Sequence, residues 1–179
     1  SGGACVATSL AIIPSEPPMI CAFAGTQGTH DAGIFLPHTQ CYDRIRERWW
    51  DPFGPLPYGL DHGSLAPIPP GTCSPDDPAK LLIFNFRTRP YGDCHPEILA
   101  YDLPGEGWTI KELERLDGLK QLGERTPEKS EWYVYHNFTD LTSPENEPRD
   151  ASGVVMANGG RTVLNFGGTT HRIKHGKRR

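Results

Sequence analysis

The fold is decided by two short stretches, Tyr42-Asp43 followed by Trp49 and Tyr101-Asp102 followed by Trp108. Seven positions separate the tyrosine from the tryptophan in both, and the two stretches lie 59 positions apart. Similarity at a fixed period is typical of repeat architectures, in which each copy is one supersecondary unit. We therefore expect one recurring unit around each stretch.

Other segments repeat around these two stretches. Short runs of apolar, β-forming residues recur at Met19–Phe23, Leu81–Phe86 and Thr162–Phe166. Strands rich in small residues precede them, at Ala4–Ala11, Gly63–Ile68 and Ser152–Ala157. The chain also has 20 Gly and 18 Pro among 179 residues, so turn signals separate the runs. Short strands with many turns predict an all-β protein.

The order of these parts resembles the kelch repeat, in which each copy forms one blade of a β-propeller. The shared order is a small-residue strand, an apolar strand ending in glycines, a Tyr-Asp strand and a tryptophan. The glycine pair is intact at Gly167-Gly168, replaced by Ala24-Gly25 in the first copy and absent at Phe86-Arg87 in the second. Glycine there permits positive φ and leaves room for a neighbouring blade.

The resemblance implies incomplete propeller blades, each a four-stranded antiparallel sheet. It divides the chain into residues 1–62 (first blade), 63–118 (second blade), 119–147 (polar insertion), 148–170 (half of a third blade) and 171–179 (basic tail). Tyr42, Trp49, Tyr101 and Trp108 would fill the space between blades. Trp108 would open the outer strand of the second blade, and Trp132-Tyr133-Val134-Tyr135 would form an extra strand. A β-sandwich is the alternative, since aromatic cross-strand pairs recur there too.

Two and a half blades do not close a ring, because propellers have roughly four to eight. The open blades would expose an apolar face and strand edges. We therefore expect a second chain, or further copies of this one, to complete the propeller. The final Lys177, Arg178 and Arg179 resemble the product of a secretory-pathway protease, and a solvated basic tail is the alternative reading.

The cysteines indicate the compartment. The blade resemblance places Cys21 and Cys41 on paired strands and Cys73 and Cys94 in loops flanking one strand, which suggests two disulfides and leaves Cys5 over. Asn137-Phe138-Thr139 is an N-glycosylation acceptor triplet. Dispersed cysteines, this triplet and a first residue other than Met favour a secreted protein in an oxidising compartment, whereas buried free thiols in a cytosolic chain are the alternative.

Composition narrows the partners. A net charge of −4 argues against a nucleic-acid surface. No apolar run approaches the roughly 20 residues that span a membrane. The cysteine and histidine spacings predict no metal site, and no motif predicts a cofactor or a catalytic group.

The sequence therefore predicts an interaction module without activity of its own, binding a protein or glycan. The candidate ligand-binding residues lie in predicted loops and in the insertion: His30, Asp31, Arg87, Arg89, Tyr91, Trp132 and Tyr135. One chain of a processed propeller enzyme of the galactose-oxidase type, or a structural assembly subunit, are the alternatives.

Overall fold

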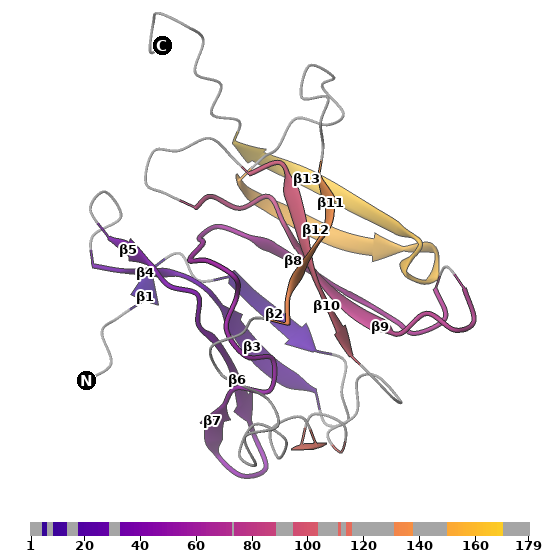
Figure 1. The fold of residues 1–179 in the computed structure, drawn as a ribbon, viewed down its shortest axis with the longest axis horizontal. Helices are drawn as coiled ribbons and strands as arrows, with labels where there is room; N and C mark the ends of the chain where they lie inside the picture. The colour runs from indigo at the N-terminus through magenta and orange to yellow at the C-terminus, as the bar shows by residue number, and fades with distance from the viewer. Residues whose placement is uncertain are drawn as a thin grey trace, which may run out of the picture.

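A computed structural model describes ten ranges of the chain: residues 5–6, 9–13, 18–28, 33–72, 74–88, 95–103, 111, 114–115, 131–137 and 150–169. These residues form antiparallel sheets, so the predicted all-β class is confirmed (Figure 1). The described part of the chain contains no helix long and apolar enough to cross a membrane.

Two four-stranded sheets and a hairpin make up most of the fold. The first sheet has the order β2 (Ser9–Ile13), β3 (Met19–Phe23), β6 (Thr39–Asp43), β7 (Arg48–Trp50). The second has the order β8 (Ser64–Ile68), β9 (Ala79–Phe84), β10 (Glu97–Leu103), β11 (Tyr133–Asn137). The hairpin joins β12 (Asp150–Ala157) to β13 (Thr162–Thr169) through the 3₁₀ turn η1 (Asn158–Gly160). A small sheet contains β1 (Cys5–Val6), β4 (Thr26–Gln27) and β5 (Ile34–Phe35).

The two four-stranded sheets share one register. Ser9 lies opposite Phe23 in the first sheet, as Ser64 lies opposite Phe84 in the second. Tyr42 lies opposite Ile20, as Tyr101 lies opposite Leu81. The hairpin follows the same scheme, with Gly153 opposite Phe166. Residues of different sheets that hold the same place in this register are called equivalent below.

The outer strand of the second sheet comes from the segment that the sequence analysis set apart as an insertion. Strand β11 pairs with β10 and begins directly after Trp132. The rings of Tyr101 and Trp132 lie 5.3 Å apart with 54° between their planes. Those of Tyr42 and Trp49 lie 5.4 Å apart at 50°. Trp132 therefore takes the place expected of Trp108, which lies outside the described residues.

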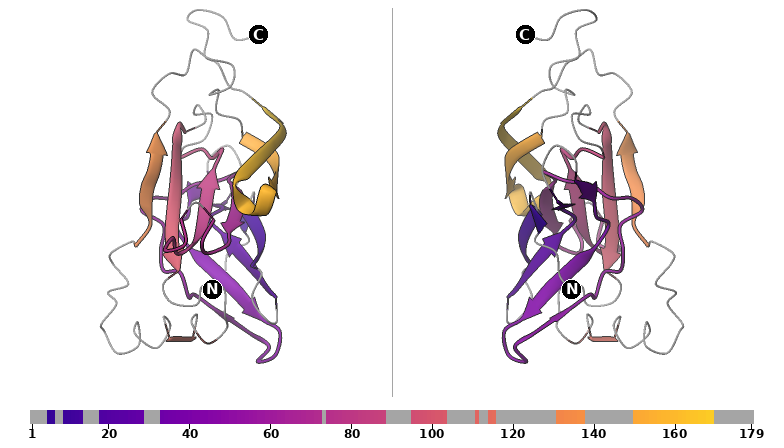
Figure 2. Two further views of the ribbon diagram at one scale, coloured as in Figure 1. Left: turned by 90° about the vertical axis from the view of Figure 1, so that its right-hand side faces the viewer. Right: turned by 90° about the vertical axis from the view of Figure 1, so that its left-hand side faces the viewer.

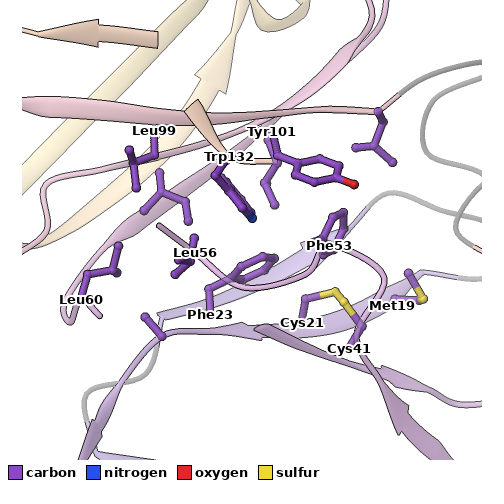
Figure 3. Packing of buried hydrophobic residues seen from close by; sticks show 14 of the residues in the cluster. Met19, Cys21, Phe23, Cys41, Phe53, Leu56, Leu60, Leu99, Tyr101 and Trp132 are labelled. Carbon is purple, nitrogen blue, oxygen red and sulfur yellow. A yellow bond between two sulfur atoms is a disulfide. The ribbon is translucent and has the colours of Figure 1, made fainter. Parts of the chain in front are cut away.

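The second four-stranded sheet lies between the first sheet and the hairpin, and each of these two packs against one of its faces. Strand β8 lies beside both β2 and β12, and in both views of Figure 2 β11 lies on the side of the second sheet away from the hairpin. Between the first and second sheets lies the main core, which includes Phe23, Phe53, Tyr101 and Trp132 (Figure 3). A smaller core lies between the second sheet and the hairpin. Strand β9 is apolar on both faces because it is covered on both.

One face of the first sheet is open. Trp49 was expected between two blades, but its side chain is 56% exposed, because no sheet of the described chain packs there. The next residue, Trp50, is 7% exposed and turns toward the core. Of the residues expected to fill the space between blades, Tyr101 is 1% exposed, whereas Trp49 lies on the face that no described sheet covers.

A turn follows Phe23, Phe84 and Phe166, the equivalent residues of the second strands, and is called the corner below. The glycine-rich corner of the hairpin has the expected backbone conformation. Gly167 and Gly168 have φ of 68° and 85°. The equivalent corners contain Ala24 and Asn85, each with φ of 58°. The left-handed turn therefore recurs at all three corners, although only the third has the glycine pair that this conformation favours.

The first of the two expected disulfides is present. Cys21 and Cys41 face each other on β3 and β6 and are bonded, with both side chains buried in the main core. Cys73 and Cys94 lie outside the described residues.

Candidate binding site at the loop end of the sheets

Two loops that connect the second strand of a sheet to its third begin side by side. The first follows Thr26 and the second follows Arg87, and both of these residues contact Asp61. The Oγ1 of Thr26 donates to Oδ2 of Asp61 at 3.4 Å. The guanidinium of Arg87 donates to both carboxylate oxygens, each at 3.3 Å. All three side chains are buried, so Asp61 anchors the base of both loops.

The backbone reinforces this anchor. Asp61 and Arg87 exchange two backbone hydrogen bonds, of 3.0 and 3.1 Å, and form an isolated β-bridge. Val6 pairs with Thr26 in the small sheet, next to the end of β3, and Asp150 pairs with Thr169 in the hairpin. The bridge is therefore the second sheet's version of a pairing found beside each corner.

His62 contacts the buried Asp61–Arg87 pair on the side that faces the surface. Arg87 donates from Nη2 to Nδ1 of His62 at 2.6 Å. His62 has a φ of 55°, and its side chain is only partly exposed. The imidazole thus lies between the buried guanidinium and the surface, so it is the part of this cluster that a ligand can reach.

A second polar group lies beside the same loop. Tyr58 donates its hydroxyl proton to Oε2 of Glu97 at 2.7 Å. The ring of His95 stacks on Phe86, with centroids 5.2 Å apart, and its backbone N–H donates to the carbonyl of Phe86. Nδ1 of His95 lies 3.4 Å from Oε2 of Glu97. These contacts hold the end of the loop that follows Arg87 against the sheet.

The chemistry of this cluster favours binding. Burial raises the pKa of Tyr58 well above its usual range, and the hydrogen bond to Glu97 raises it further. The phenol therefore keeps its proton and acts as a fixed donor, whereas an activated phenolate would need a lowered pKa. The described residues contain no group of three or more metal-ligating side chains.

The structure reassigns two of the predicted ligand-binding residues. Arg87 is buried in the ion pair with Asp61, and Trp132 is buried in the main core, so both support the fold. Tyr135 is exposed on β11, as a binding residue must be. Asn137 is exposed at the end of the same strand, where a glycosylation acceptor would be accessible. The remaining predicted residues lie outside the described residues: His30, Asp31, Arg89, Tyr91, Trp108, Lys177, Arg178 and Arg179.

Sequence reasoning missed Tyr58, Asp61 and Glu97 as parts of one site. The available signal was the similar segment before each first strand, Asp61-His62-Gly63-Ser64 and Asp150-Ala151-Ser152. An acidic residue repeated near the start of two first strands indicates a fixed polar contact, because a carboxylate that becomes buried there needs a partner. Nothing local pointed to Arg87 as that partner, 26 positions away.

No protein-family model matches this chain, and comparison with curated proteins gives no significant match.

Proposed function

We propose that this chain is a segment of a secreted kelch-type β-propeller and works as an interaction module, binding a protein or glycan at the loop end of its sheets. The observation that carries the proposal is the shared anchor. Loops from two successive sheets begin at Thr26 and Arg87 and are fixed to one buried carboxylate, that of Asp61. Loops held by a rigid scaffold are the usual place for binding residues.

The repeated architecture supports the propeller part of the proposal. The two four-stranded sheets have the same strand order and register, and the hairpin follows the register of their first two strands. Their first strands lie next to one another, with β8 beside β2 and β12. Sheets repeated around an axis with their first strands innermost are the arrangement of a β-propeller.

The disulfide supports the secreted part. A buried Cys21–Cys41 bond is stable where the environment is oxidising, as it is outside the cell. The triplet at Asn137 and the basic residues Lys177, Arg178 and Arg179 agree with passage through a secretory pathway. Mass analysis of peptides from the secreted protein tests each of these modifications separately.

Loop variants test the binding role. Screening the protein against glycans and against secreted proteins identifies the ligand. Two double variants, His30→Ala/Asp31→Ala and Arg89→Ala/Tyr91→Ala, should then each weaken binding of that ligand by at least about tenfold, or about 1.4 kcal/mol. Arg44→Ala is the matched control, because Arg44 is exposed in the turn at the opposite end of the first sheet. Equal binding by the loop variants and the control would refute the proposed site.

A further inference from the structure

The two outermost sheet faces of the described chain are exposed, and they match two faces that pack against each other inside the chain. On the first sheet, Ile20, Tyr42 and Trp49 form the first open face, with Ile20 44% and Trp49 56% exposed. On the hairpin, Val155, Leu164 and Phe166 form the second open face, each at least 41% exposed. Exposed apolar surfaces of this kind mark interaction sites.

Each open face has a covered equivalent in the second sheet. The positions of the first open face correspond to Leu81, Tyr101 and Trp132, which are 0%, 1% and 5% exposed because the first sheet covers them. The positions of the second open face correspond to Ala66, Leu82 and Phe84, which the hairpin covers. The second sheet therefore shows which kind of sheet packs against each of these faces when the face is covered.

The aromatic contact identifies the occupant. Between the first and second sheets, Phe23 packs edge-on against Trp132, with ring centroids 6.0 Å apart. On the first open face the pair Tyr42–Trp49 repeats the geometry of Tyr101–Trp132, but no phenylalanine of the described residues packs against it. The equivalent of Phe23 in the hairpin is Phe166, which is 56% exposed. The chain thus presents both the aromatic pocket and the ring that fits it, on opposite ends of its stack of sheets.

We infer that a second copy of this chain covers the first open face, with Phe166 of one copy packed against Tyr42 and Trp49 of the next. This rests on the proposed propeller-type stacking and adds the identity of the covering chain. The contact is head to tail, since two different faces meet, and such contacts close into rings when the rotation permits. Two copies that each cover the other's first open face would form a closed dimer without an unpaired apolar face.

Charge substitutions at the centre of each face test the inference. Wild-type protein should sediment as a closed assembly whose mass does not increase at higher concentration. Trp49→Glu and Phe166→Glu should each break the ring and weaken association by at least about 30-fold, the loss expected for a central aromatic anchor. Ile34→Glu is the control, because Ile34 is 70% exposed on β5 and belongs to neither face.

Mixing the two variants distinguishes head-to-tail from face-to-face association. The Trp49→Glu chain retains Phe166 and the Phe166→Glu chain retains Trp49, so an equimolar mixture should form open dimers through one intact interface. Wild-type protein that stays monomeric at about 100 μM, far above typical specific dissociation constants, would overturn the inference. So would a Phe166→Glu chain that assembles normally. Neither result affects ligand binding by the loops, so the proposed function is judged by its own variants.

Discussion

The covered face of the second sheet and the open face of the first have equivalent residues in the same register, but only the first of these faces packs against another sheet. Leu81, Tyr101 and Trp132 are buried, whereas Ile20 and Trp49 at equivalent positions are largely exposed. Their strands have the same order and register, so the local sequence does not cause the difference. Whether these side chains are buried depends on the presence of a neighbouring sheet. An aromatic pair contributes its full hydrophobic energy only when that neighbour is present.

The strongest test of this comparison removes the indole from each face. Trp132→Ala should lower the free energy of unfolding by about 3–5 kcal/mol, because it empties the centre of the main core. Trp49→Ala should cost about 0.5 kcal/mol or less in dilute monomeric protein, as exposed substitutions do. Urea unfolding followed by far-UV circular dichroism measures both. Equal losses in a monomer would mean that the face bearing Trp49 is already covered.

A buried and an exposed ion pair extend the comparison to charge. Asp61→Ala should cost about 3–5 kcal/mol, because it leaves the guanidinium of Arg87 buried without its carboxylate. Asp102→Ala should cost about 1 kcal/mol or less, since Asp102 is largely exposed and its pair with Lys80 is near the surface. The same denaturant titration measures both variants.

A second substitution separates this charge effect from loss of packing. The double variant Asp61→Ala/Arg87→Met removes the buried guanidinium together with the carboxylate, so it should be more stable than Asp61→Ala alone. A double variant that is less stable by the full sum of the two losses would contradict this explanation.

The sequence allowed most strands to be predicted, because their signals are local. Runs such as Met19–Phe23 and Leu81–Phe86 are apolar and β-forming, and strands occur at both. The Tyr-Asp pairs marked two equivalent third strands for the same reason. The fourth strand of the second sheet could not be located this way. A seven-residue spacing pointed to Trp108, but a tryptophan reached through a longer connection can stand beside Tyr101 equally well, as Trp132 does.

The candidate site was harder to predict than the fold. Asp61 and Arg87 are 26 positions apart, and only the register of the second sheet brings them together. Arg87 was expected among the ligand-binding residues because it lies in a predicted loop, and its burial follows from a partner that no local pattern reveals. Which faces are covered also depends on tertiary neighbours.

The disulfide provides a smaller test of equivalence between the sheets. Cys21 and Cys41 are 20 positions apart, so replacing both with alanine should lower the free energy of unfolding by about 3 kcal/mol. Leu82 and Ala100 are the directly paired equivalents in the second sheet. If the registers correspond, Leu82→Cys/Ala100→Cys should form a further disulfide, detected by peptide mapping. Two free thiols at 82 and 100 in oxidised, folded protein would contradict the equivalence.

The corners give the smallest expected effects and isolate the backbone contribution. Gly167→Ala should cost about 0.5–1 kcal/mol, because a left-handed alanine is strained by about 1–2 kcal/mol and regains part of that from lower chain entropy in the unfolded state. Apart from the residues next to it in the chain, no described residue has an atom within 4 Å of the added Cβ, so the described neighbours add no steric conflict. Ala24→Gly should be close to neutral, since relief of the same strain is offset by loss of a buried methyl group.

Glu47→Gly is the control, with φ of 52° on an exposed turn, and should gain about 0.5–1 kcal/mol. If Gly167→Ala is neutral while Glu47→Gly stabilises, the corner of the hairpin does not hold its left-handed turn, and its equivalence to the other two corners fails.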